Sequence, residues 1–144
     1  MSIEVIYWDT SAILSALLQD THTPVARSHL GRKGVHLVSS LAGAEFHACI
    51  ARLLRDGHLV ATSAQATLLA FEQGPWRRIT TLPSWELYPA LSSRYHLRGA
   101  DLWHLALTLS LRPDLPEISL LTFDNALFAA AAGEGLAPAT SPGP

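Results

Sequence analysis

The sequence predicts an α/β fold built on a central, mostly parallel sheet of four to five strands. Short apolar runs rich in β-branched and aromatic residues recur along the chain, and each is too short for a helix of ordinary length. Segments with helical periodicity separate these runs, as in successive strand–helix–strand units. The runs are nearly continuous in apolar residues, which is typical of strands covered by helices on both faces.

The first half of the chain is expected to contain two strands, each followed by two helices. Apolar runs at 3–8 and 35–40 form the strands, and both end in small polar residues. Pro24 opens the second helix because proline suits the first helical turn. Gly57 lies just past the third helix, where helices commonly terminate. The four helices are expected at residues 11–18, 24–32, 41–55 and 63–73.

The second half continues the alternation. Gly74 and Pro75 stop the fourth helix, and Gly99 separates a helical stretch from a strongly apolar helix that Pro113 ends. A short fifth strand is expected at 136–137, after the last helix. The other elements expected here are a strand at 77–83, helices at 85–97 and 100–112, a strand at 117–124 and a helix at 125–135.

Length and composition indicate one domain at residues 1–138, followed by a disordered Pro-rich tail at 139–144. Hydrophobic residues make up 49% and charged residues 15%, which favours a compact globule over disorder. The single cysteine excludes an internal disulfide framework. We therefore expect a cytoplasmic protein without a membrane partner, because the sequence also has no stretch apolar enough to span a bilayer.

Three aspartates occupy similar positions. Asp9, Asp101 and Asp124 each lie at or near the start of an expected helix, and Asp9 and Asp124 directly follow expected strands. Taken singly, each is explained as a helix cap, because aspartate is a favoured N-cap and an acid in the first turn offsets the helix dipole. The alternative is that they hold a charged group.

Glu45 lies at the edge of an apolar helical stripe. The 3.6-residue period places it close to Cys49 on the expected helix 41–55. It is too deep for a fully solvated position and too shallow for a buried one. A boundary residue paired with Arg52, two turns along the same face, is the structural alternative.

The four acids together suggest a metal site. In open α/β sheets, ligands bind outside the carboxyl ends of the strands, where Asp9 and Asp124 are expected and which Asp101 could face. Carboxylates converging there would repel one another unless a cation neutralised them. Hard oxygen ligands suit Mg²⁺ or Mn²⁺. Such a site can activate water and stabilise a phosphoryl transition state.

These residues resemble the PIN domain family and, within it, the VapC-type toxin ribonucleases. Four blocks carry the resemblance, in order and over nearly the whole chain: "YWDTSAIL", "SSLAGAEFHACIARL", "LRGADLWHLALTL" and "LLTFDNALFAAAAGEGL". Trp8 before the first acid and Trp103 beside His104 depart from the family pattern in detail. The resemblance implies a PIN-like three-layer α/β/α fold and a Mg²⁺- or Mn²⁺-dependent endoribonuclease.

The resemblance also implies roles and partners. The four acids, Asp9, Glu45, Asp101 and Asp124, would be the catalytic metal ligands, the last through water. Hydrogen bonds from Ser11, Thr10 and Thr122 would support them, with capping as the alternative for Thr10. The implied partners are an RNA substrate, a cognate antitoxin and a second copy of the chain in a homodimer.

Further residues are candidates for contact with RNA or a partner. Arg52 and His104 are candidate phosphate contacts, although scattered solvated arginines and a core-edge histidine bonded to the backbone are the alternatives. Trp76 and Trp85 flank a loop and would either stack on bases or pack at an interface. Apolar side chains at 53–54 and 67–71 exceed what one small core needs and suggest self-association.

Other functions fit the sequence less well. A phosphatase with a nucleophilic aspartate needs a second acid two residues later, and position 11 is serine. None of the seven histidines pairs with a cysteine or another histidine at zinc-ligand spacing. No G-x-S-x-G elbow indicates a serine hydrolase. A catalytically silent PIN-like module that binds RNA or protein stays open as the alternative.

Overall fold

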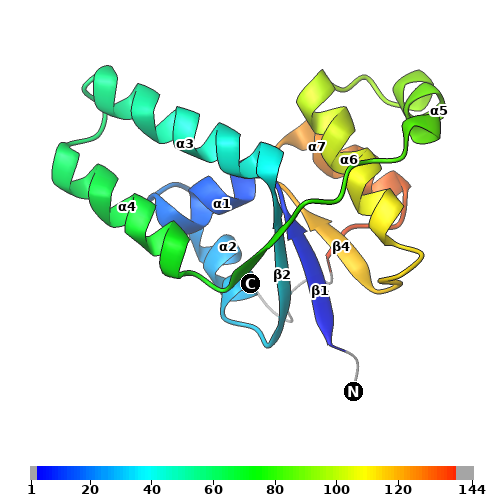
Figure 1. Cartoon of the computed structure of the whole chain (residues 1–144), viewed down its shortest axis with the longest axis horizontal. Coiled ribbons are helices and arrows are strands. Elements are labelled where there is room, and N and C mark those ends of the chain that lie inside the picture. The colour runs from blue at the N-terminus through cyan, green and yellow to red at the C-terminus, as the bar shows by residue number, and fades with distance from the viewer. Residues whose placement is uncertain (1–2, 139–144) are drawn as a thin grey trace.

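The computed structural model describes residues 3–138 and has a four-stranded sheet between two layers of helices (Figure 1). All three strand pairs are parallel, and the strand order is β3-β2-β1-β4. The expected α/β fold with a parallel sheet is thus confirmed, whereas the expected disordered tail at 139–144 lies outside the described residues. The strands are β1 (Glu4–Trp8), β2 (Gly34–Ser39), β3 (Trp76–Ile79) and β4 (Ile118–Leu121).

The helices divide between the two faces of the sheet. Side chains alternate along β1, so Ile6 and Trp8 pack into one layer while Val5 and Tyr7 pack into the other. The first layer contains α1 (Thr10–Leu17), α2 (Thr23–Leu30), α3 (Ser40–Arg55) and α4 (Ala61–Gln73). The second contains a 3₁₀ turn η1 (Trp85–Leu87), α5 (Tyr88–Arg94), α6 (Gly99–Leu111) and α7 (Asn125–Gly133).

Side-chain caps start three of the helices. Asp9, Ser39 and Asp124 each accept a hydrogen bond from a backbone N–H in the first turn of the helix that follows. Gly57, with φ +78°, follows the end of α3 as expected, because this conformation suits glycine. Within residues 3–138, no helix is long and apolar enough to cross a membrane.

The expected fifth strand at 136–137 is wrong, because these residues form no strand. The carbonyl of Leu136 accepts a hydrogen bond from the N–H of Leu120 in β4 at 2.8 Å, and the Leu136 side chain is buried. The segment after α7 therefore runs along β4 without a ladder, and the sheet within the described residues has four strands.

The strand order creates a switch point between β1 and β4. The chain moves from β1 to β2 to β3 in one direction, with helices of the first layer as connections, and then returns across the sheet to β4 on the other side of β1. Connections leave the neighbouring ends of β1 and β4 toward opposite faces. In such sheets this point leaves a crevice at the carboxyl ends of the strands, where ligands bind.

Candidate active site at the carboxyl ends of β1 and β4

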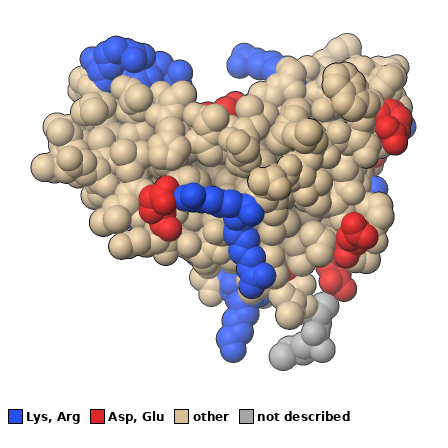
Figure 2. Space-filling model, viewed as in Figure 1, with Lys and Arg blue, Asp and Glu red and all other residues tan. Residues whose placement is uncertain are grey.

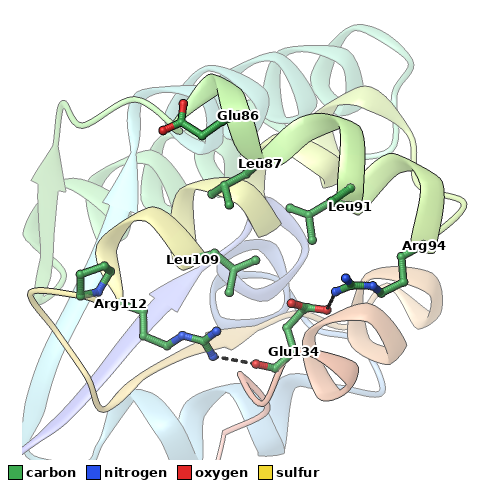
Figure 3. A pocket seen from close by; sticks show the side chains of 9 residues that line it. Glu86, Leu87, Leu91, Arg94, Leu109, Arg112 and Glu134 are labelled. Carbon is green, nitrogen blue, oxygen red and sulfur yellow. Dashed lines mark hydrogen bonds and ion pairs between the residues drawn. The ribbon is translucent and has the colours of Figure 1, made fainter.

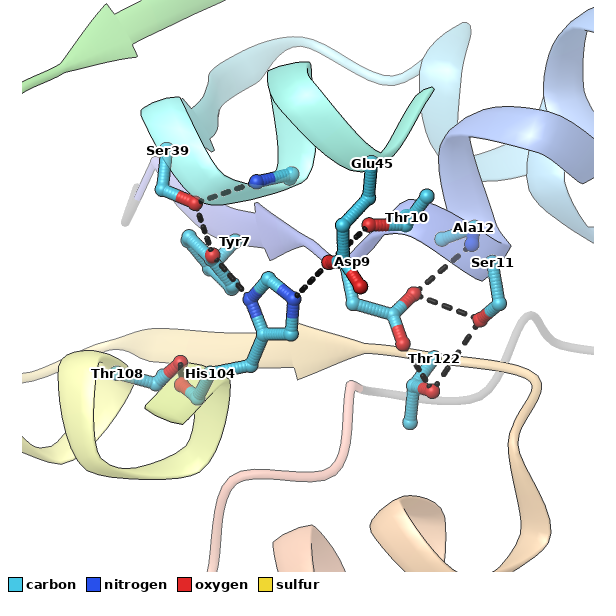
Figure 4. A network of polar contacts seen from close by, with 11 residues as sticks. Tyr7, Asp9, Thr10, Ser11, Ala12, Ser39, Glu45, His104, Thr108 and Thr122 are labelled. Carbon is cyan, nitrogen blue, oxygen red and sulfur yellow. Dashed lines mark hydrogen bonds and ion pairs between the residues drawn. The ribbon is translucent and has the colours of Figure 1, made fainter. Parts of the chain in front are cut away.

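Asp9 is a buried helix cap at the end of β1 (Figure 4). Its Oδ1 accepts hydrogen bonds from the N–H of Ala12 at 2.9 Å and from Oγ of Ser11 at 2.7 Å. Its Oδ2 accepts from Oγ1 of Thr122 at 2.5 Å. Burial raises the pKa of the Asp9 carboxyl, and these hydrogen bonds partly oppose the rise. The expected capping role is confirmed.

The hydroxyls of Ser11 and Thr122, which bond Asp9, also hold the loop that follows β4. Oγ of Ser11 accepts the N–H of Phe123 at 3.0 Å, and Oγ1 of Thr122 accepts the N–H of Asp124 at 3.1 Å. Each hydroxyl therefore donates to the carboxylate of Asp9 and accepts from the backbone of the β4–α7 connection. Ser11 and Thr122 lie where the sequence predicts supporting residues.

Glu45 projects from α3 toward the same region. Its Oε1 accepts hydrogen bonds from Oγ1 of Thr10 at 2.8 Å and from Nε2 of His104 at 3.0 Å. The bond from His104, more than any other contact, lowers the pKa of Glu45. The pairing with Arg52 is not formed, because Arg52 is exposed and makes no ion pair within residues 3–138. Thr10 bonds Glu45, and Asp9 provides the cap.

Asp101 and Asp124 complete the set of acids. Asp101 lies in the first turn of α6, and its carboxylate makes no hydrogen bond or ion pair among the described residues. Burial raises its pKa most, followed by the charges on Asp124 and Asp9, and Glu45 adds to the rise. Asp124 is exposed and caps α7 through the N–H of Leu127 at 2.9 Å. The structure thus brings the four acids into one electrostatic neighbourhood.

The acids fit a hydrated divalent cation better than a closed ligand shell. In residues 3–138, no three His, Cys, Asp or Glu side chains are grouped closely enough to hold a metal ion together. The carboxylate of Asp101 and Oε2 of Glu45 nevertheless lack protein donors there. Mg²⁺ commonly binds through one or two carboxylates and keeps several waters. The donor chemistry therefore suits Mg²⁺ or Mn²⁺, with water supplying the remaining ligands.

His104 is not placed for the expected phosphate contact. The ring is 2% exposed, and both of its nitrogens have partners, with Nδ1 2.6 Å from the hydroxyl of Tyr7. Neither nitrogen bonds the backbone, so the alternative, a histidine at the edge of the core that bonds the backbone, is not observed either. No motif in the sequence singles out Tyr7. The signal was its place on β1, since strand alternation buries it opposite Trp8 and a buried tyrosine hydroxyl needs a partner.

Neither alternative considered for Trp76, stacking on bases or packing at an interface, is observed, because its side chain lies in the core. Trp76 is 9% exposed and packs edge-on against Trp8, with ring centroids 5.5 Å apart. Trp8 is itself fully buried, and its Nε1 donates to Nδ1 of His36 at 2.9 Å. Trp85 is 83% exposed and remains free to contact a partner. A tryptophan beside the first acid is therefore accommodated by burial in the first helical layer.

The surface around the acids is notched. Figure 2 shows acidic side chains at the floor of a notch between the α3 side and the α6 side, with basic side chains over the far end of α3 and on the opposite wall. A hollow of about 400 Å³ lies nearby at the carboxyl ends of β2 and β3 and is lined by Gly43, His47, Phe71 and Arg78, among others. It borders α3, the helix that carries Glu45.

A larger hollow of about 520 Å³ lies in the second helical layer, among α5, α6 and the end of α7 (Figure 3). Glu134 is held there by Arg94, which binds its carboxylate at 2.6 Å, and by Arg112, which donates to its backbone carbonyl at 2.6 Å. None of the four acids lines this hollow. We therefore assign these arginines to packing of the second layer.

Comparison with known proteins finds relatives of the fold only. No family model and no curated protein sequence matches the chain. Among solved structures, PAE2754 from Pyrobaculum aerophilum is 15% identical with a TM-score of 0.60, covering 91% of this chain and 81% of that one. VapC20 of Mycobacterium tuberculosis, a toxin that cleaves the sarcin-ricin loop, is 18% identical with a TM-score of 0.55, covering 87% and 94%. Likeness at this identity shows a shared architecture.

Proposed function

Proceeding from the PIN-like three-layer α/β/α fold that the chain shares with VapC20, we propose that it is a Mg²⁺- or Mn²⁺-dependent endoribonuclease and the toxin of a type II toxin–antitoxin pair. One observation carries the proposal. Asp101 has no protein partner among the described residues, and burial, together with the charges on Asp124, Asp9 and Glu45, raises its pKa. Crowded carboxylates at a switch point favour a bound cation and, through it, a phosphate.

We assign the four acids different roles according to the hydrogen bonds that each accepts. Asp101 and Oε2 of Glu45 would hold the cation directly, since both lack protein donors, and Asp124 would act through water. Asp9 is fixed by three donors, which orient its carboxylate without rotamer freedom. When bound, the cation supplies the positive charge that lets a phosphodiester approach four acids and stabilises its transition state.

The proposed reaction is hydrolysis of an RNA phosphodiester. The oxygen of a water attacks phosphorus, the bond from phosphorus to the 3′-oxygen breaks, and the products are a 5′-phosphate and a 3′-hydroxyl. The acidic floor of the notch would bind the scissile phosphate through the cation. Exposed arginines of α3, Arg52 among them, would contact flanking phosphates, since arginine suits phosphate geometry.

The proposed partners are a cognate antitoxin and a second copy of the chain, in the cytoplasm. Leu54, Val60 and Leu69 are 43%, 65% and 55% exposed on or between α3 and α4. Phe71, also in the apolar stretch expected to favour self-association, is instead buried in the core. The remaining exposed side chains give the α3–α4 pair an apolar surface that suits a homodimer interface.

Cleavage of a structured RNA in the presence of Mn²⁺ tests the proposal. We expect cleavage that stops with excess EDTA and is absent from an Asp101→Asn variant purified in parallel, which controls for contaminating nuclease. Robust cleavage by the parent in EDTA would overturn the metal-dependent mechanism.

A catalytically silent PIN-like module that binds RNA or protein is the alternative. The lack of a preassembled three-ligand group within residues 3–138 favours it. Such a module would bind RNA without cleaving it at any Mn²⁺ concentration, and Asp101→Asn would leave binding unchanged or stronger because a negative charge is removed.

A further inference from the structure

A chain of buried polar groups lies behind Glu45 and joins the two helical layers through the sheet (Figure 4). Oγ of Ser39, at the end of β2, is 2.7 Å from the hydroxyl of Tyr7, which is 2.6 Å from Nδ1 of His104. Nε2 of His104 then reaches Oε1 of Glu45 at 3.0 Å. Ser39, Tyr7 and His104 are 3%, 0% and 2% exposed, so the chain is closed to solvent.

The donors and acceptors fix one direction for this chain. A carboxylate oxygen accepts hydrogen bonds, so Nε2 of His104 donates to Oε1 of Glu45. In the tautomer with its proton on Nε2, Nδ1 is the acceptor, and the hydroxyl of Tyr7 donates to it. Burial raises the pKa of Tyr7, which keeps this proton in place.

The other end of the chain agrees with this direction. The hydroxyl of Tyr7 donates its hydrogen bond to His104, and its oxygen accepts one from Oγ of Ser39. Oγ of Ser39 in turn accepts the N–H of Ala42 at 3.2 Å, as the cap of α3. In this tautomer every hydrogen bond from the backbone of α3 to Glu45 points the same way, and each group has a partner.

The two oxygens of Glu45 differ in their hydrogen bonds. Oε1 accepts from both His104 and Thr10, whereas no described residue donates to Oε2. Figure 4 shows the Glu45 carboxylate directed toward Asp9. Two donors on one oxygen fix the plane of the carboxylate and leave the second oxygen available.

We infer that Ser39, Tyr7 and His104 are positioning residues: Ser39 and Tyr7 hold the His104 ring so that its Nε2–H donates to Oε1 of Glu45, and this bond directs Oε2 of Glu45 at a divalent cation. The role of the cation rests on the proposed function, whereas the direction of the hydrogen bonds does not. In metal sites, partners behind the ligands fix ligand orientation, and their loss typically costs about 10- to 100-fold in metal affinity or activity.

Nitrogen-15 NMR of the metal-free protein at neutral pH tests the direction. The imidazole signals of His104 are assigned by their absence from a His104→Gln variant. We expect a proton on Nε2, the nitrogen that faces Glu45. A ring with its proton on Nδ1 and none on Nε2 would leave Glu45 without this donor and overturn the inference.

Calorimetric titration with Mn²⁺ tests the positioning. His104→Leu removes the donor to Glu45 and should weaken Mn²⁺ binding about 10- to 100-fold. His104→Gln keeps an N–H that can reach Oε1, so it should recover most of the affinity. Thr108→Val is the matched control, because it removes only a buried hydroxyl that donates to the backbone carbonyl of His104 at 2.8 Å. It should bind like the parent.

Equal Mn²⁺ affinity in His104→Leu and Thr108→Val would overturn the positioning role, with folding of both checked by circular dichroism. If His104→Leu does not fold, the Mn²⁺ affinities of His104→Gln and Tyr7→Phe are compared instead. Tyr7→Phe removes the hydrogen bond that fixes the His104 ring, so it should bind Mn²⁺ more weakly than His104→Gln, and equal affinities would overturn the positioning role. A parent that binds no Mn²⁺ would contradict the proposed function and the positioning role together. The NMR result would still decide the direction of the hydrogen bonds.

Discussion

Oγ1 of Thr122 donates a hydrogen bond to Oδ2 of Asp9 at 2.5 Å, although 113 positions separate the two residues in sequence. The bond joins the end of β4 to the end of β1 at the switch point of the sheet. The same hydroxyl accepts the N–H of Asp124, so one side chain sets the positions of two of the four acids. Its removal should therefore disturb the site and the fold together.

Thr122→Val should destabilise the protein by about 1–3 kcal/mol, because it leaves a buried oxygen of Asp9 without this donor. Cleavage should fall as well. Urea unfolding in EDTA measures the first effect and an RNA cleavage assay the second. Thr122→Ser is the matched control: it keeps the hydroxyl and should retain most of both properties. A valine variant as stable as the parent would show that Oδ2 does not need the bond.

Asp9→Asn and Asp124→Asn should separate capping from metal binding. Asparagine caps a helix about as well as aspartate, so Asp124→Asn, at an exposed cap, should cost the metal-free protein only a few tenths of a kcal/mol. Asp9→Asn should cost more, because the amide nitrogen cannot accept the hydrogen bond that Thr122 donates to Oδ2. The parent should gain roughly 2.7 kcal/mol when Mn²⁺ exceeds its dissociation constant a hundredfold. Melting curves with and without Mn²⁺ should show a smaller gain in each variant. An undiminished gain and full activity in Asp9→Asn would mean that this residue is a cap alone.

Asp101→Asn should change how stability depends on pH in EDTA. The pKa of Asp101 is raised above 3.8 in the folded state, so the folded protein binds this proton more tightly than the unfolded chain. The free energy of unfolding should consequently fall as pH rises from 3.8 through the folded pKa. The asparagine variant lacks this loss and should be the more stable protein at neutral pH. Its advantage should shrink as pH falls toward 4 in thermal melts. An advantage that grows on acidification would contradict the assignment.

Self-association should depend on the α3–α4 pair. Leu54→Glu and Leu69→Glu place charges on the exposed apolar side chains and should convert a dimer into a monomer, because an unpaired charge is costly in an apolar interface. Light scattering at tens of micromolar measures the mass. Val25→Glu is the control, because Val25 is similarly exposed, at 50%, but lies on α2. A parent that is already monomeric would rule out this interface.

Periodicity and capping chemistry were enough to predict the sheet and most helices. The acids could be predicted because Asp9 and Asp124 follow apolar runs and Glu45 interrupts a helical stripe, and all three signals are local in sequence. Their partners are not local. The contact of Tyr7 with His104 spans 97 positions, so no spacing rule could find it.

Two expectations failed for the same reason. The sequence offers Arg52 as the alternative partner of Glu45 because it shows only neighbours on the same helix, whereas packing against α6 brings the donor His104. Trp76 was expected beside a loop at the surface, but β3 starts at Trp76 and turns its ring into the first layer. In both cases tertiary packing outweighed a pattern that was correct locally.

The two outer strands have a consequence for the protein at high concentration. Exposed strand edges can pair with strands of other molecules and seed aggregation. On one side, β3 is only four residues long and carries two exposed arginines, Arg77 and Arg78. On the other, the carbonyl of Leu136 already occupies an N–H of β4. Edge-to-edge growth of the folded sheet is thus discouraged on both sides, and loss of material in concentrated solution should begin with unfolding.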